Sequence, residues 1–146
     1  MLYYSAMNDS SSEPAQAMWR LIFAARALED RIETGLTKLG VSSAKLGVLT
    51  ELVKAGEPLT LSDLAARISC VRSNVTQLVD RLEADGLVRR TDAPGDRRSV
   101  LAELTAEGRR SQREGTQYVE SVQRDFAKSV PASERAALMT ALAGLK

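Results

Sequence analysis

The chain has 146 residues, of which 44% are hydrophobic and 27% are charged, and its formal net charge is +1. These values are typical of a folded domain and exclude general disorder. One cysteine and no histidine exclude an internal disulfide and leave almost no ligands for a zinc, copper or haem site, so we expect no metal and no cofactor.

Enzymatic activity is also not expected. The sequence has no histidine base, no nucleophile paired with a base and no glycine-rich phosphate loop. It has no apolar run of about 18 residues and no signal-peptide pattern at its start. We therefore predict a cytoplasmic protein without a membrane partner.

The N-terminal segments are a polar lead and a long helix. Residues 1–13 are rich in serine and lack periodicity, which predicts disorder. In residues 14–40 the apolar side chains recur at steps of three and four, which predicts one helix about 36 Å long that ends at Gly40. Part of its apolar stripe must meet another helical segment or another subunit.

Residues 41–105 have the pattern of a winged helix-turn-helix head. A helix capped by Ser42 or Ser43 is followed by a short helix, which opens with Thr60–Asp63 in the manner of a capping box. A turn of about four residues leads to an amphipathic helix that ends at Gly86. The β-prone segments 87–90 and 99–104 flank the turn APGD, which predicts a two-stranded hairpin, the wing.

The C-terminal residues 106–146 read as helices. Thr105 is a candidate cap for a helix over residues 106–129, and Pro131 or Ser133 opens a last helix that ends at Leu142. We interpret residues 14–40 and 106–146 as dimerisation helices, because their apolar stripes exceed what one head can cover. The predicted fold is mostly α with a small β-hairpin wing.

The polar face of the helix before Gly86 is the candidate for reading DNA. A helix fits the major groove, where asparagine and glutamine pair with adenine edges and arginine pairs with guanine. A solvated face is the alternative, but a position after a short helix and before a basic hairpin favours DNA. The candidates are Arg72, Ser73, Asn74, Thr76 and Gln77, with Arg81 on phosphate.

The hairpin is flanked by two arginine pairs, Arg89/Arg90 and Arg97/Arg98, which predict a focused basic patch on a nearly neutral body. Asp96 and Arg98 lie two residues apart, so in a strand they share one side and the carboxylate can orient the guanidinium.

The segments LSDLAARI, VTQLVDRLEADGLVRR and DRRSVLAELTAEG resemble the multiple antibiotic resistance regulator (MarR) family over residues 59–108. The resemblance implies a regulator of transcription, which we expect to be a repressor released by a small-molecule effector, with an activator as the alternative. In families of this type a wing arginine enters the narrow A·T-rich minor groove, and we assign this role to Arg98 and backbone contact to Arg97. Two-fold symmetry of the expected homodimer places two reading helices about 34 Å apart, which predicts a pseudo-palindromic double-stranded operator.

The family commonly has glycine and then serine where this chain has Ser69 and Val71. Since the Val71 side chain cannot cap a helix, we predict a later start of the reading helix, with Ser73 or Asn74 as its cap.

The resemblance also implies a pocket for a small aromatic effector between the helical region and the head. Trp19, Phe23 and Tyr118 are its candidates, although packing in a core or an interface is the simpler interpretation of these rings. Cys70 is either a packed residue, which we favour because free cysteine is usually buried, or a thiol sensor that makes the protein redox-responsive. A winged helix that contacts another protein is a further alternative, but it leaves the Arg97/Arg98 tip without a purpose.

Overall fold

The computed structural model describes residues 12–69 and 71–145, without the side chains of Arg72, Arg97 and Arg98. The fold is mostly α with a small antiparallel sheet, as predicted. The elements in chain order are α2 (Glu13–Lys38), α3 (Ser43–Ala55), β1 (Leu59–Thr60), α4 (Leu61–Arg67), α5 (Arg72–Ala84), β2 (Val88–Ala93), β3 (Asp96–Leu104), α6 (Ala106–Ser129) and α7 (Ala132–Ala143).

The predicted disordered lead lies outside the described residues except for Ser12 and Glu13, and Glu13 is already helical. No helix in the described ranges combines the length and the apolar character that a membrane crossing requires.

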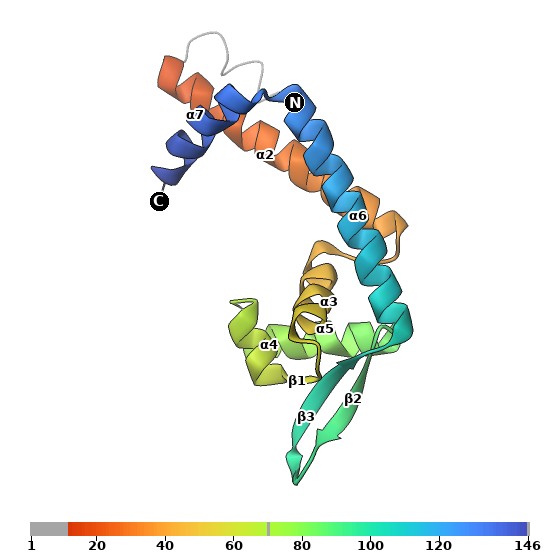
Figure 1. Cartoon of the computed structure of the whole chain (residues 1–146). Helices are drawn as coiled ribbons and strands as arrows, with labels where there is room; N and C mark the ends of the chain where they lie inside the picture. The colour runs from red at the N-terminus through yellow and green to blue at the C-terminus, as the bar shows by residue number, and fades with distance from the viewer. Residues whose placement is uncertain (1–11, 70, 146) are drawn as a thin grey trace.

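Figure 1 shows an elongated molecule with a head at one end. The head contains α3, α4, α5 and the sheet, and the β2–β3 hairpin projects from it. The long helices α2 and α6 pack against each other and lead away from the head, and α7 lies at the opposite end from the hairpin. The protein therefore presents a compact head and a long helical arm.

The hydrophobic core lies in the head and at its junction with the arm. Leu49 of α3, Leu64 of α4 and Leu82 of α5 are fully buried, and Leu36 joins them from the C-terminal part of α2. Each such side chain contributes about 1.5–3 kcal/mol on removal from water. These contacts give α5 a rigid support on its apolar face.

Hydroxyl caps start three of the helices, as the sequence predicts. The Ser42 hydroxyl accepts a hydrogen bond from the Lys45 amide at 3.2 Å, which decides between Ser42 and Ser43 as the cap of α3. Thr60 accepts from the Asp63 amide at 3.0 Å, and Thr105 accepts from the Gly108 amide at 3.0 Å. Each bond satisfies an amide that the helix itself leaves without a partner.

The sheet differs from the predicted two-stranded hairpin in two ways. It has three strands in the order β1-β3-β2, because Leu59 of β1 pairs with Ala102. The hairpin is also longer than predicted, since pairing continues to Ala93 opposite Asp96 and leaves only Pro94 and Gly95 in the turn. The polar residues near the tip lack the apolar alternation that reveals a strand, so their pairing was not visible in the sequence.

Candidate nucleic-acid interface

Helices α4 and α5 form the helix-turn-helix. The short α4 ends at Arg67, and Ser69 then adopts a left-handed backbone conformation with φ of 51°. The Ile68 amide donates to the Leu64 carbonyl at 3.0 Å and closes the helix. The left-handed region favours glycine, which explains why glycine suits this position and shows that Ser69 is strained.

Helix α5 begins at Arg72, so the prediction of a later start is wrong. Val71 is its N-cap and forms no side-chain cap hydrogen bond. The backbone nevertheless closes the first turn, because the Asn74 and Val75 amides donate to the Val71 carbonyl at 3.0 and 3.3 Å. Ser73 and Asn74 therefore lie within the first turn of the helix, and neither is its cap.

The faces of α5 are clearly divided. Val75, Val79 and Leu82 are fully buried against the head. Thr76 is half-buried, so it belongs less to the outer face than the sequence suggested. The predicted DNA-contacting residues with exposed, described side chains are Ser73, Asn74, Gln77 and Arg81.

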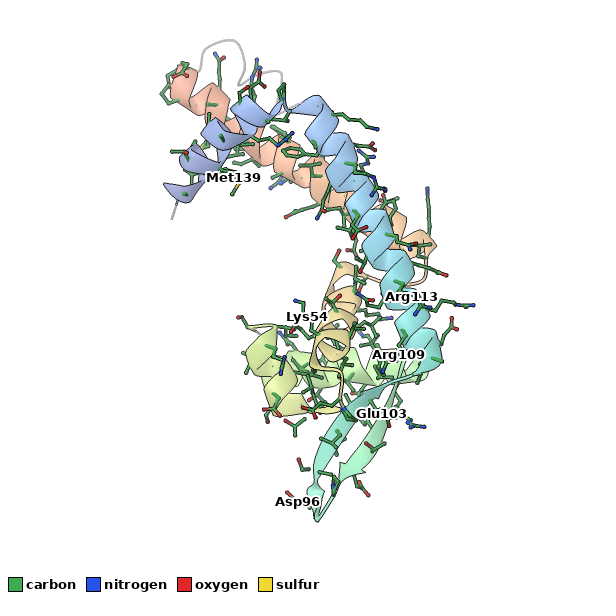
Figure 2. The ribbon with its side chains drawn as sticks, in the orientation of Figure 1. Lys54, Asp96, Glu103, Arg109, Arg113 and Met139 are labelled. Atoms are coloured by element: carbon green, nitrogen blue, oxygen red, sulfur yellow. The ribbon has the colours of Figure 1, made fainter. Side chains whose placement is uncertain are left out.

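The hairpin tip carries the second group of predicted contacts. Figure 2 shows Asp96 at the far end of the hairpin and Glu103 near its base. Arg97 and Arg98 follow Asp96 on β3, but their side chains are outside what the structure describes. The predicted orientation of Arg98 by Asp96 thus stays a prediction.

The other arginine pair does not form the free basic patch that we predicted. Arg89 donates from Nε to Glu103 Oε2 at 2.8 Å across the strand pair. That hydrogen bond raises the pKa of Arg89 and lowers the pKa of Glu103. Arg90 pairs with Asp80 and lies 3.6 Å from a Glu83 oxygen. Both guanidinium groups are therefore neutralised by carboxylates of the chain.

Arg90 connects the wing to α5. Its guanidinium meets Asp80 and Glu83 on the helix, and its backbone amide donates to Glu83 Oε1 at 3.1 Å. Our sequence reasoning missed this link. The available signal was the pair of acids one helical turn apart, directly before a strand that carries arginine.

The base of the wing is held by a compact set of bonds after β3. The Thr105 hydroxyl donates to the Gly86 carbonyl at 2.7 Å while it caps α6. Gly108 packs so closely that a Cβ atom there would lie 2.0 Å from the Leu87 carbonyl oxygen. The contacts of Thr105 and Gly108 thus connect the end of α5, the base of the wing and the start of α6.

An open groove of about 890 Å³ lies between α2 and α6. Tyr118 lines it, donates to the Arg31 carbonyl at 2.8 Å and packs on Gly35. Trp19 and Phe23 pack on each other with ring centroids 6.2 Å apart, and they are not among the residues that line this groove. The structure therefore does not bring the three predicted aromatic residues into one pocket. The groove is lined by Ala27, Asp30, Arg31, Thr34, Gly35, Lys38, Leu39, Glu114, Gln117 and Tyr118.

Similarity to known proteins agrees with this arrangement. The sequence model of the MarR family matches residues 39–99. The crystal structure of YusO from Bacillus subtilis superposes with a TM-score of 0.72 at 30% identity, and the match covers 94% of this chain and all of YusO. The chain belongs to the MarR family. The family's relatives are transcription regulators, and the winged-helix fold is shared with them.

Two MarR-family relatives illustrate the sequence similarity. The regulator PrsX from Escherichia coli is 35% identical over 88 residues, which are 60% of this chain and 53% of PrsX. The repressor MdtR from Bacillus subtilis is 42% identical over 73 residues, which are 50% of this chain and 46% of MdtR. The matched region thus spans about half the length of these curated relatives.

Two further MarR-family structures carry ligands. A mutant MarR from E. coli complexed with operator DNA is 26% identical, with a TM-score of 0.71 over 90% of this chain and 96% of that one. CouR from Rhodococcus jostii RHA1, bound to p-coumaroyl-CoA, is 25% identical, with a TM-score of 0.69 over 91% and 93%. None of these similarities supports the redox alternative, and Cys70 lies outside the described residues. The described residues also contain no group of three or more acidic or cysteine side chains placed to hold a metal ion.

Proposed function

We propose that this protein is a homodimeric, sequence-specific DNA-binding regulator of transcription. The observation that carries the proposal is the division of α5, whose polar face is exposed while its apolar face is fully buried in the head. The hairpin projects from the same head. A helix with an open polar face and an adjacent projecting hairpin can enter the major groove and the neighbouring minor groove of one duplex.

The predicted DNA-contacting residues of α5 and of the wing have different roles in this proposal. Asn74 and Gln77 read adenine edges, and Arg81 contacts phosphate one turn later. Arg72, Ser73 and Thr76 contribute base or phosphate contacts at the same helix. On the wing Arg98 enters the minor groove, Arg97 contacts the backbone and Asp96 orients Arg98.

Exposed apolar surface on the arm supports a homodimer. Met18 and Phe23 on α2 are 50% and 40% exposed, and Met139 on α7 is 68% exposed. None of the residues of α7 is buried, and Figure 2 shows Met139 at the end of the molecule opposite the hairpin. A second copy that covers these side chains removes them from water. We propose residues 14–40 and 106–146 as the dimerisation region and residues 41–105 as the DNA-binding head.

Two-fold symmetry then places two α5 helices on successive major grooves, about 34 Å apart, over a pseudo-palindromic operator. We propose that the dimer represses transcription by occupying this site, a role supported by the similarity to the repressor MdtR. We further propose that a small aromatic effector binds the groove beside Tyr118 and releases the DNA. The open groove and the similarity to the ligand-bound CouR support this. An effector acts by favouring a state in which the two heads no longer match the half-sites.

DNA binding is tested by titrating the full chain against its own upstream DNA over a range of salt. Gln77→Ala and Arg98→Ala are compared with Gln123→Ala and Arg124→Ala, which remove the same groups from exposed positions on α6. Because α6 belongs to the proposed dimerisation region, light scattering first establishes that all four variants have the mass of the wild-type protein. We expect weaker binding of the first two variants only, and a smaller salt dependence for Arg98→Ala. Equal binding by all four variants would reject the assigned residues. Absence of binding to any duplex would reject the function and favour a protein-contact module.

The dimer is tested by light scattering. We expect the wild-type protein to have the mass of two chains, and Met139→Glu to shift it toward one chain because a carboxylate is not tolerated in an apolar interface. Ser62→Glu adds the same charge at an exposed position on α4 and should leave the mass unchanged. A wild-type mass of one chain at all concentrations would exclude the two-half-site mechanism.

The effector groove is tested with a panel of small aromatic acids and phenols. We expect at least one compound to raise the melting temperature and to weaken operator binding by the wild-type protein. Gln117→Trp fills the groove and should abolish both effects, whereas Gln123→Trp adds the same ring to α6 away from the groove and should abolish neither. If both variants respond to the compound like the wild-type protein, the ligand binds outside this groove.

A further inference from the structure

Val71 is an exposed aliphatic residue at the entrance of α5. Its side chain is 62% exposed, whereas Val75 and Val79 on the same helix are fully buried. It is the N-cap of α5 but forms no cap hydrogen bond. Serine, threonine, aspartate and asparagine are preferred there because their side-chain oxygen accepts from a first-turn amide. The Val71 side chain thus contributes neither to the hydrophobic core nor to the capping of α5, which its backbone carbonyl alone performs.

The surface around Val71 is polar. Ser73, Asn74 and Gln77 follow within the first two turns of α5, and all three are exposed. In a helix-turn-helix, the N-terminal residues of the second helix face the base edges. Val71 directly precedes these residues at the N-terminus of α5 and is itself exposed, so its isopropyl group is adjacent to the surface that they form.

The major groove offers one apolar partner for such a side chain. Guanine, cytosine and adenine present hydrogen-bond donors and acceptors there, and only thymine presents a methyl group, at C5. An isopropyl group against a donor or an acceptor removes water from it without replacing the hydrogen bond, which is unfavourable. Against the thymine methyl, both apolar groups leave water together.

We propose that Val71 determines specificity by contacting the C5 methyl group of a thymine in each half-site of the operator. This inference rests on the proposed function, because it requires α5 to enter the major groove. It adds an apolar contact to the hydrogen-bonding residues Asn74 and Gln77, and it assigns thymine to the position that Val71 faces.

The experiment begins with an operator selected by the full-length protein from a pool of random duplex DNA. Each thymine of the selected half-site is then replaced by deoxyuridine, which removes only the methyl group. We expect one thymine per half-site whose replacement weakens wild-type binding about fourfold, as estimated for one buried methyl group. Replacement of thymines elsewhere in the operator should change binding much less.

Variants at position 71 identify the residue that senses the methyl group. In Val71→Ala the thymine-to-deoxyuridine ratio should fall, because the shorter side chain retains only one methyl group, and Val71→Ile should retain the ratio. Val71→Ser restores a cap oxygen and should also lose the ratio while still binding the operator. Because Val71 is exposed, Val71→Ala should melt at the wild-type temperature, which separates a lost contact from a folding defect.

The inference and the proposed function fail in different ways. Salt-sensitive binding to a selected operator with equal affinity for thymine and deoxyuridine would overturn the inference alone. An unchanged ratio in Val71→Ala, or selected half-sites without thymine, would do the same. Failure to select any sequence would overturn the proposed function and the inference together.

Discussion

Arg90 on β2 forms an ion pair with Asp80 on α5, so the wing and the reading helix are joined by side chains as well as by the chain that connects them. Glu83 strengthens the link because its carboxylate accepts from the Arg90 backbone amide at 3.1 Å. The Arg90 side chain is 29% exposed, which limits screening by solvent. This contact therefore adds to the core packing that holds the two proposed DNA-reading elements in place relative to each other.

Replacing Arg90 by alanine should therefore destabilise the head by about 1 kcal/mol, since the two ion pairs are partly shielded from water. Operator affinity should fall as well, although Arg90 itself faces the protein. Urea unfolding and DNA titration measure the two effects. Arg89→Ala is the matched control, because Arg89 is 65% exposed and, among the residues that the structure describes, its side chain pairs with Glu103 of the same hairpin. Equal losses in both variants would show that the link to α5 is unimportant.

Gly108→Ala should destabilise the protein by about 2 kcal/mol or more, because the new Cβ atom would lie 2.0 Å from the Leu87 carbonyl oxygen. Gly47→Ala is the control, since a Cβ at this position in α3 meets no atom within 4 Å. That variant should be more stable by about 0.5–1 kcal/mol, because alanine favours a helix interior. Urea unfolding measures whether the free energy of unfolding falls or rises in each of the two variants. A stabilising Gly108→Ala would mean that the wing base is loosely packed.

Ser69→Gly should stabilise the head by up to about 1 kcal/mol. Ser69 has a φ of 51°, where an L side chain is disfavoured by about 1–2 kcal/mol, and glycine removes this strain at some cost in unfolded-chain entropy. Ser69→Ala keeps a Cβ atom and should not gain stability. Thermal unfolding of the three proteins checks the order. A gain in Ser69→Ala equal to that in Ser69→Gly would show that backbone strain is not the cause.

The arm should lose a small stabilisation at low pH. A hydrogen bond from Arg31 on α2 holds the pKa of Asp125 on α6 below its ordinary value. A lowered pKa in the native state stabilises the fold above the ordinary pKa of about 4, and this contribution disappears as the pH falls through the lowered value. The urea midpoint of the wild-type protein should therefore be higher than that of Asp125→Asn at pH 7, and the difference should shrink as the pH falls below the ordinary pKa of about 4. A difference that persists at low pH would contradict the ion pair as its source.

Local patterns in the sequence were sufficient to predict the helices, the hairpin and the family. The apolar spacing in α5, the hydroxyls of Ser42 and Thr105, and the turn at Gly95 are signals that neighbouring residues carry, so helices, caps and the hairpin could be predicted. The segment from Leu104 to Gly108 likewise carries part of the family resemblance, although its contacts at the base of the wing involve residues that local patterns do not reveal. These features depend on backbone preferences and on which face must leave water.

Only the tertiary structure decided how those elements act on one another. Glu103 neutralises Arg89, and Asp80 neutralises Arg90. Strand β1 joins the sheet, and Trp19 is not among the residues that line the groove beside Tyr118. These contacts join residues that are far apart in the sequence, so local patterns do not reveal them. Helix α5 begins at Arg72 without a side-chain cap, and Val71 is exposed. Packing of the buried face of α5 stabilises a helix start without a side-chain cap, which capping preferences alone would not predict.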